Sequence, residues 1–286
     1  MAHFRLIVVS LMALLASPAF PAAQEPAAPH PEAAPSLRPG SRIILKFPEL
    51  PRTLFAMKFD KETPPQLCLT LPENYTDSRK FPLFVFIWGG DGGDCTGSGK
   101  GPAVMSNRDC IFVNLPLFKK KWDPSGPFKG LLVDIKEDGE LICTAYTAML
   151  KKIYETIPNI DTGNNIIGGM SNGAHTVVAL FERGDRYLMG LFKNLILAEG
   201  GYYMVSTYEN YKDKNILYMY GDYVGVEGWV GKQGREQLPA VIKKFAEAAE
   251  SHSLKTTAIV MPNTGHEVPA RFDPDIKSWV NKQLGK

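Results

Sequence analysis

Continuous apolar runs alternate with amphipathic segments along most of the chain. Residues 81–88 are apolar on both alternating faces, which is typical of a strand buried between two helical layers, and further strands are expected at 110–117, 192–198, 215–220 and 256–261. Residues 139–157 and 238–252 instead place apolar side chains at helical spacing, and a closing helix is expected with Asp273 as its N-cap. Strands that alternate with helices predict an α/β protein with a mostly parallel central sheet flanked by helices.

The N-terminal part of the chain has a different pattern. Short β-prone segments at 42–47, 53–59 and 66–71 are separated by proline and aspartate turns, which predicts antiparallel strands at the N-terminal edge of the sheet. Residues 24–40 are rich in proline and alanine and lack large apolar side chains, so we expect a disordered linker there. The folded domain should then span residues 41–286.

Residues 1–23 have the pattern of a secretory signal peptide. The apolar run from Leu6 to Leu15 is shorter than the roughly 20 residues of a membrane-spanning helix. Small residues allow cleavage near Ala19 to Ala23. We therefore expect a secreted or periplasmic protein without stable membrane insertion, with an uncleaved anchor as the alternative.

Charge and cysteine content narrow the class of protein further. The chain has 32 Lys and Arg against 30 Asp and Glu, and this net charge of +2 gives no reason to expect a nucleic-acid partner. An oxidising compartment would permit two disulfides among its four cysteines, in any of three pairings. Four buried thiols are the alternative, because cysteine is among the most buried residue types. The cysteines are Cys68, Cys95, Cys110 and Cys143.

One glycine-rich stretch carries a specific chemical signature. Gly169, Ser171 and Gly173 fit the G-x-S-x-G motif, and they lie between a short apolar run and a predicted helix. In that motif a sharp turn from strand to helix holds the serine hydroxyl at the edge of the sheet, and the flanking positions must lack side chains. The pattern predicts that Ser171 is a nucleophile, with the start of the helix behind it to stabilise negative charge.

A serine nucleophile needs a base within hydrogen-bond reach, and histidine is the usual one. His266 lies in the loop directly after strand 256–261, from which it can reach the serine, and is the predicted base. His175 follows Ser171 by about one helical turn and is expected to pack, whereas His252 is expected on the surface.

The acid that orients the histidine should lie between the serine and the histidine in the chain. Asp222 directly follows Gly221 at the end of the strand 215–220 and is the first candidate. Glu227, in the same loop, is the alternative acid.

A second glycine-rich loop, Gly89 to Gly93, follows the buried strand 81–88. A phosphate-binding loop is one interpretation, because Gly97-Ser98-Gly99-Lys100 looks similar. It fails, since Asp94 and Gly101 stand where that motif needs a glycine and a serine or threonine. The loop is instead expected to supply a backbone donor to an oxyanion.

With these features in this order, the chain resembles the α/β-hydrolase superfamily. Within it, the chain is most similar to secreted esterases of the feruloyl esterase, polyhydroxyalkanoate depolymerase and esterase D type. Leu71-Pro72-Glu73-Asn74-Tyr75 and Phe81-Pro82-Leu83 look like the opening of those enzymes, and the likeness covers about residues 65–286. The resemblance implies that Ser171 is the nucleophile, His266 the base, and the backbone N–H groups of Asn172 and Gly90 the oxyanion hole.

The chain departs from the family at two positions. Trp88 precedes Gly89-Gly90 where the family commonly has histidine, and this change alters the wall of the pocket. The family's acid often stands three residues after the strand-end glycine, where this chain has Val224, so Asp222 is offset.

The sequence therefore predicts a serine esterase that hydrolyses a carboxylic ester, on a small molecule or a polymer, through an acyl-serine intermediate. It implies no organic cofactor and no metal. A serine peptidase of the prolyl-oligopeptidase type would use the same residues. The alternative from another class is a catalytically silent binding protein whose aromatic side chains hold a glycan: Tyr202, Tyr203, Tyr223 and Trp229.

Overall fold

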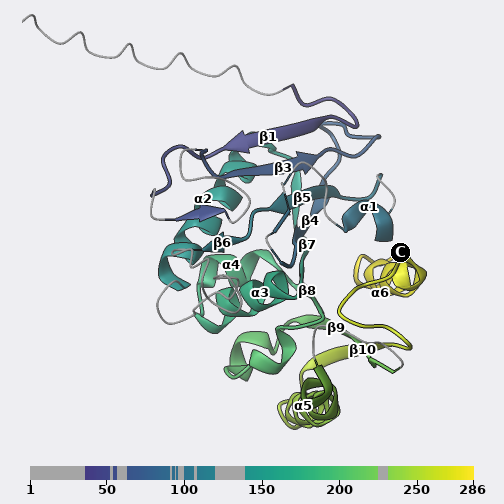
Figure 1. The fold of residues 1–286 in the computed structure, drawn as a ribbon. Helices are drawn as coiled ribbons and strands as arrows, with labels where there is room; N and C mark the ends of the chain where they lie inside the picture. The colour runs from purple at the N-terminus through teal and green to yellow at the C-terminus, as the bar shows by residue number, and fades with distance from the viewer. Residues whose placement is uncertain are drawn as a thin grey trace, which may run out of the picture. The chain divides into compact units, whose positions relative to one another are not determined.

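The computed structural model describes residues 36–51, 54–56, 63–90, 92–93, 95, 100–105, 108–119, 139–224 and 231–286 (Figure 1). Residues from Pro35 onward belong to one compact unit. The predicted signal peptide and residues 24–35 of the predicted linker lie outside the described residues, so both stay predictions. No helix in the described ranges is long and apolar enough to cross a membrane.

An eight-stranded sheet forms the centre of this unit. Its strands, in spatial order, are β1 (Arg42–Lys46), β3 (Gln66–Thr70), β5 (Ile111–Leu115), β4 (Phe81–Ile87), β7 (Ile160–Met170), β8 (Asn194–Ala198), β9 (Asn215–Gly221) and β10 (Lys255–Met261). Neighbouring strands from β5 to β10 pair in parallel, whereas β1 and β3 are antiparallel at one edge. The predicted α/β class, with an antiparallel N-terminal edge, is confirmed.

A separate pair of short strands, β2 (Phe55–Ala56) and β6 (Phe118–Lys119), is antiparallel. The predicted strand 53–59 lies only partly within the described residues, and β2 is the part that the structure shows.

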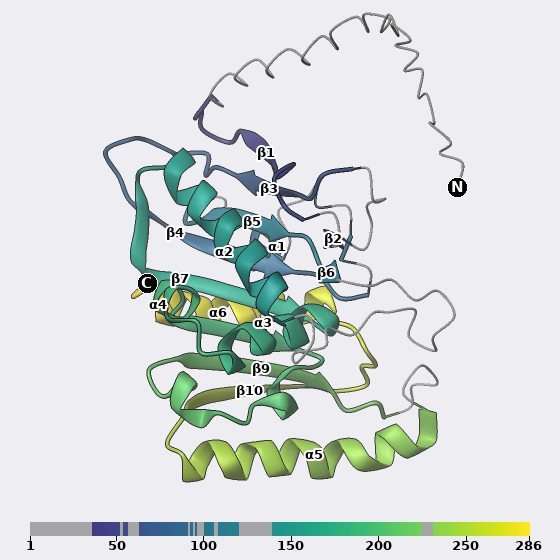
Figure 2. The same cartoon turned by 90° about the vertical axis from the view of Figure 1, so that its left-hand side faces the viewer.

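Helices cover both faces of the large sheet. One face carries α2 (Gly139–Thr156), α3 (Asn172–Glu182) and α4 (Arg186–Leu191), and the other carries α1 (Gly101–Val104) and α6 (Asp273–Gln283) (Figure 1). Helix α5 (Gly231–Ser251) runs along β10 (Figure 2) and contacts η1 (Tyr202–Met204). Two further turns of 3-10 helix are η2 (Tyr208–Tyr211) and η3 (Ala270–Phe272).

Strand β4 shows why the two helical layers form. Leu83, Val85 and Ile87 belong to the core on the α2 and α3 side, and Phe84 and Phe86 belong to the core on the α6 side. Because alternate side chains point to opposite faces of a sheet, a strand that is apolar at every position must be covered on both faces. This arrangement places the carboxyl ends of β4, β7, β8, β9 and β10 at the same edge of the sheet.

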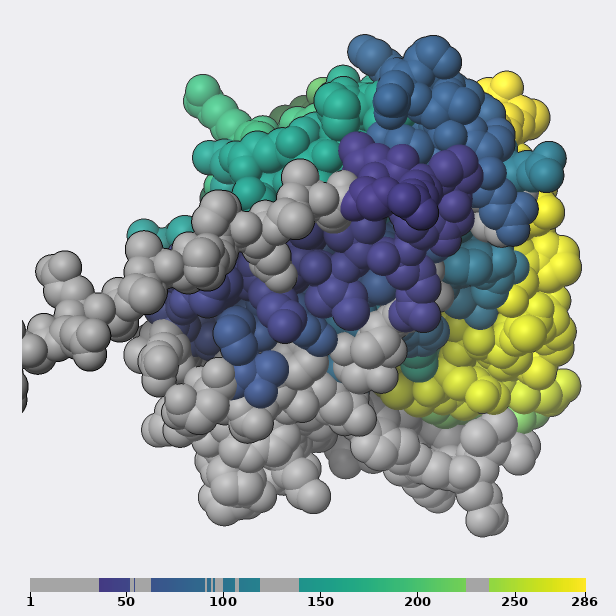
Figure 3. All heavy atoms as spheres, turned by 90° about the horizontal axis from the view of Figure 1, so that it is seen from above, coloured from purple at the N-terminus to yellow at the C-terminus, as the bar shows by residue number. Residues whose placement is uncertain are grey.

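Helix α6 begins differently from the sequence-based expectation. Phe272, not Asp273, occupies the N-cap position, and Asp273 lies in the first turn. Its carboxylate Oδ1 instead lies 2.6 Å from the Lys100 ammonium, an ion pair that links the start of α1 to the start of α6. The last residue, Lys286, forms an ion pair with Asp109, so the C-terminus lies beside the segment before β5. Figure 3 shows the C-terminal part of the chain, in yellow, against blue segments of the N-terminal half.

Candidate active site

The turn between β7 and α3 has the geometry that the G-x-S-x-G motif predicts. Ser171 has φ 52° and ψ −118°, a conformation that non-glycine residues adopt rarely. A Cβ atom at Gly169 would lie 2.3 Å from the carbonyl carbon of Gly173, and one at Gly173 would lie 2.0 Å from the Ile87 oxygen. Both positions require glycine because the strand, the turn and the helix pass within direct contact of one another.

The structure brings the predicted nucleophile and the predicted base together. His266 lies between β10 and η3, and its Nε2 is 2.8 Å from the Ser171 Oγ. This distance is that of a hydrogen bond, and it meets the geometric requirement for a base that accepts the serine proton.

The carboxylate beside the other imidazole nitrogen belongs to Glu199. Its Oε2 lies 3.5 Å from the His266 Nδ1, and the Glu199 side chain is 3% exposed. Glu199 directly follows β8 and has φ 54°, so its backbone, like that of Ser171, takes a left-handed turn at the strand end. The chain order of serine, acid and histidine is kept, but the acid stands one strand closer to the serine than predicted.

Two further hydrogen bonds hold the Glu199 carboxylate. The backbone N–H of Gly221 donates to Oε1 at 2.5 Å, and the Tyr223 hydroxyl donates to Oε2 at 3.0 Å. The Tyr223 oxygen also lies 3.3 Å from the His266 Nδ1. Burial, and next the charge of Glu199, raises the pKa of Tyr223, so this hydroxyl keeps its proton. The Nδ1–H group of His266 thus faces two oxygen acceptors, the carboxylate and the phenol.

Asp222, the predicted acid, is engaged elsewhere. Its Oδ1 accepts a hydrogen bond from the Val224 backbone N–H at 3.0 Å, as aspartate does when it stabilises a local turn. The next residue, Tyr223, is the one that turns inward and is 8% exposed. The expectation for Asp222 is therefore corrected to Glu199 as the carboxylate beside His266. The alternative acid, Glu227, lies outside the described residues.

The two predicted oxyanion donors belong to segments that meet at Ser171. Gly90 follows β4 with φ +59°, and Asn172 is the first residue of α3. The Asn172 side-chain amide donates to the Gly90 carbonyl at 3.2 Å and so joins the two segments. A Cβ atom at Gly89 would lie 2.8 Å from the Ser171 Cβ, which shows how closely the end of β4 approaches the serine.

The other two candidate histidines make aromatic contacts. The His175 Nε2 lies 2.6 Å from the Tyr203 hydroxyl, and its Nδ1 has no partner among the described residues. Burial, and to a lesser extent the charge on His266, lowers the pKa of His175 to about 4, so this side chain is neutral near neutral pH. The exposed His252 ring stacks on Tyr208 with centroids 4.1 Å apart.

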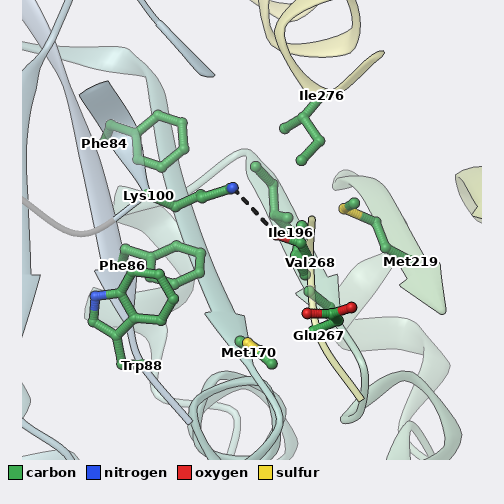
Figure 4. Close-up of a pocket in the computed structure, with 11 residues that line it drawn as sticks. Phe84, Phe86, Trp88, Lys100, Met170, Ile196, Met219, Glu267, Val268 and Ile276 are labelled. Atoms are coloured by element: carbon green, nitrogen blue, oxygen red, sulfur yellow. Dashed lines mark hydrogen bonds between the residues drawn. The ribbon is translucent and has the colours of Figure 1, made fainter. Parts of the chain in front are cut away.

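An apolar cavity of about 230 Å³ lies between the sheet and α6 (Figure 4), and its lining includes Met170, Ala198 and Glu267, the chain neighbours of Ser171, Glu199 and His266. Its walls include the side chains of Phe84, Phe86, Ile196, Met219 and Ile276. We refer to the space enclosed by these residues as the α6 cavity. Lys100 also lines it and donates a hydrogen bond to the Val268 carbonyl at 3.5 Å.

Two further expectations, the disulfides and the aromatic glycan surface, are corrected. All four cysteines are buried, and no disulfide joins them in the described parts of the chain. Burial raises the pKa of the Cys110 and Cys143 thiols to about 12. Tyr202 and Tyr223, proposed for a glycan surface, are 1% and 8% exposed, whereas Tyr203 is 45% exposed. Trp229 lies outside the described residues. Among the residues that the structure describes, no cluster of three or more metal-binding side chains occurs.

The sheet order, the turn at Ser171 and the histidine after the last strand together define an α/β-hydrolase fold. The chain is similar to a poly(3-hydroxybutyrate) depolymerase from Bordetella parapertussis, with a TM-score of 0.53, 14% identity and coverage of 86% of this chain and 90% of that one. It is also similar to a ferulic acid esterase from Anaeromyces mucronatus, with a TM-score of 0.50, 14% identity and coverage of 90% and 94%.

A third similar structure is a dipeptidyl aminopeptidase IV-like protein from Bacteroides ovatus, with a TM-score of 0.53 and 16% identity. The likeness covers 86% of this chain but only 36% of that larger one. No protein-family model and no curated protein matches the sequence. At these identities the structures show the fold that the chain shares with them.

Proposed function

We propose that the protein is an exported serine esterase that hydrolyses a carboxylic ester through an acyl-serine intermediate. The observation that carries the proposal is the 2.8 Å hydrogen bond between the Ser171 Oγ and the His266 Nε2 at a strained turn. The buried Glu199 carboxylate on the far side of the imidazole completes the set of groups that serine hydrolysis needs.

The reaction follows from this geometry in two halves. In the first, the Ser171 Oγ bonds to the ester carbonyl carbon while its proton passes to the His266 Nε2. The carbonyl electron pair moves onto oxygen, where the backbone N–H groups of Gly90 and Asn172 stabilise it. When the intermediate collapses, the bond to the alcohol oxygen breaks, and that oxygen takes the proton from His266. The acyl group remains on Ser171.

In the second half, a water molecule takes the place of the alcohol. His266 removes its proton, the hydroxide oxygen bonds to the acyl carbon, and the bond to Ser171 breaks as the serine recovers its proton. Glu199 stabilises the imidazolium that forms in both halves and keeps the imidazole proton on Nδ1. No further group is needed for the atoms and charges to balance.

One observation favours an ester hydrolase over a peptidase, and another favours it over a binding protein. The poly(3-hydroxybutyrate) depolymerase and the ferulic acid esterase, each aligned over nine-tenths of its own length or more, are named for ester substrates. The dipeptidyl aminopeptidase IV-like protein is matched over little more than a third of its length. For a binding protein, the buried positions of Tyr202 and Tyr223 remove two of the four aromatic residues proposed for its surface.

The test is hydrolysis of p-nitrophenyl acetate and butyrate by the mature protein, by Ser171→Ala and by His266→Ala. We expect both variants to lose at least about 10⁴-fold in kcat, because removal of either group abolishes the same step. A third variant, His252→Ala, changes an exposed ring away from Ser171 and should keep the parent rate. Equal trace rates in all four proteins would refute the proposal, and cleavage of a chromogenic peptide in preference to both esters would favour the peptidase.

A further inference from the structure

We propose that the α6 cavity binds the acyl group of the substrate and selects esters of apolar carboxylic acids. This inference rests on the proposed esterase activity, because it assigns the acyl group that Ser171 would carry. It adds a binding site, made by the sheet and α6, to the catalytic groups described above.

Four residues of the cavity lining are chain neighbours of the proposed catalytic and oxyanion residues. Three of its lining residues, Met170, Ala198 and Glu267, are the chain neighbours of Ser171, Glu199 and His266 respectively. A fourth lining residue, Trp88, precedes the Gly89-Gly90 pair of the oxyanion segment. A cavity that shares its walls with all of these segments can receive a group that is covalently attached to the serine.

The chemistry of the walls favours an uncharged, apolar group. Phe86 and Trp88 pack edge to face with ring centroids 5.0 Å apart, and Figure 4 shows both rings on one side of the cavity with Met219 opposite. Lys100, the one cation among the described residues of the lining, is paired with Asp273 at 2.6 Å and donates to a backbone carbonyl. Its charge is therefore already compensated. The carboxylate of the lining residue Glu267 belongs to an exposed side chain and is solvated, so the remaining walls offer little to a polar ligand.

The acyl group fits this position better than the alcohol does. The alcohol must leave, and water must then approach His266 from the same side, so that side needs a path to solvent. The acyl group stays on Ser171 through both halves of the reaction. A half-enclosed space lined by phenylalanine, isoleucine and methionine holds such a group and offers the alcohol no hydrogen-bonding partner.

The volume sets the size of the group. An apolar cavity of about 150 Å³ accommodates a benzene molecule, so the 230 Å³ of the α6 cavity is enough for a six-membered ring with a short chain, or for a medium-length alkyl chain. Acetyl would leave most of it empty. The predicted substrates are esters of aromatic or medium-chain aliphatic acids.

Pairs of isomeric esters separate acyl recognition from general hydrophobicity. Ethyl butyrate and butyl acetate have the same atoms, as do ethyl hexanoate and hexyl acetate, but the longer chain lies on opposite sides of the ester bond. We expect kcat/KM, measured by acid release, to rise roughly fourfold for each methylene added to the acyl side until the cavity is full. The same methylenes on the alcohol side should change it by less than about twofold.

Two variants fill the cavity. Ile276→Phe replaces a buried α6 side chain that lines it, and Val268→Phe adds a ring from the loop after His266, where the fold tolerates change better. Each should reduce the ratio of the hexanoate to the acetate rate at least tenfold. Val260→Phe is the matched control on the exposed side of β10, at a position that is 47% exposed, and should leave the acyl profile unchanged.

The outcomes are distinct. Ser171-dependent hydrolysis that ignores acyl length, or that rises with alcohol length instead, overturns the cavity proposal and leaves the esterase proposal intact. Loss of all Ser171-dependent hydrolysis overturns both. If Ile276→Phe does not fold, the isomer pairs in the parent and the profile of Val268→Phe still decide the question.

Discussion

Replacement of Glu199 by glutamine tests whether this residue, rather than Asp222, is the acid of the triad. Glutamine has the same shape and keeps an oxygen that can accept the 2.5 Å hydrogen bond from the Gly221 N–H. It removes the negative charge that lies 3.5 Å from the His266 Nδ1. Its amide group would also donate to Nδ1 and so favour the tautomer with the proton on Nε2, which cannot accept the serine proton.

The expected loss follows from the distance and the burial. Two unit charges 3.5 Å apart interact by about 4 to 5 kcal/mol at an effective dielectric constant near 20. Because the Glu199 side chain is 3% exposed, solvent screens little of this interaction. If most of it acts on the imidazolium of the transition state, kcat should fall by about three powers of ten.

The assay is kcat and KM for an ester substrate in the parent, Glu199→Gln and Asp222→Asn, with thermal unfolding to check that each variant folds. Asp222→Asn is the matched control, since it makes the same chemical change where the carboxylate contacts only a backbone N–H among the described contacts. It should retain the parent rate within about threefold. A hundredfold loss in Asp222→Asn together with an active Glu199→Gln would refute this assignment of the acid.

Three other changes have expected outcomes. Folding lowers the pKa of His175 to about 4, so between about pH 6.5 and 4 the unfolded chain binds a proton that the folded protein does not. The free energy of unfolding should therefore fall by up to about 3 kcal/mol as the pH drops through that range. Urea unfolding of His175→Gln should show a smaller fall than the parent, and an identical pH dependence in both proteins would contradict this. Gly173→Ala would place a Cβ atom 2.0 Å from the Ile87 oxygen. The melting temperature should therefore drop by about 10 °C, and an unchanged melting temperature would contradict the close approach of helix and strand at this turn. Tyr223→Phe removes the 3.0 Å hydrogen bond to Glu199 and should lower kcat about tenfold with little change in KM, whereas a change in KM alone would argue for substrate contact.

The sequence was most informative where structure is decided locally. The Gly-x-Ser-x-Gly turn is dictated by which side chains can fit between a strand and the next helix, and it is found at Ser171 as predicted. The buried strand β4 was recognised because it is apolar at every position, and β8 because four of its five residues are apolar. The start of α5 at Gly231, ahead of the predicted residue 238, was missed because its first turns carry polar residues without apolar spacing.

The carboxylate beside His266 was not predicted, because its position depends on the order of strands in space. The prediction looked for a carboxylate after the strand 215–220, whereas Glu199 follows β8, the strand that pairs directly with β7. A local signal was present: Glu199 is the acidic residue between the apolar run Leu195 to Ala198 and the pair Gly200-Gly201. A Cβ atom at Gly201 would lie 2.6 Å from the Ala174 oxygen, so this turn packs tightly against α3, as the turn at Ser171 does.

Because Met170, Ala198 and Glu267 adjoin the proposed catalytic residues Ser171, Glu199 and His266 in the chain, they are poor positions at which to redesign substrate preference. A bulky or β-branched replacement there would shift the backbone of a reacting group, and a displacement of 1 Å can cost about a hundredfold in rate. Val268 and Ile276 contact the same space from the loop and from α6, and neither adjoins a catalytic residue in the chain. A mutant library confined to these two positions would vary acyl preference while the strand ends that hold the chemistry stay fixed, which makes α6 the part of this scaffold that is open to directed evolution.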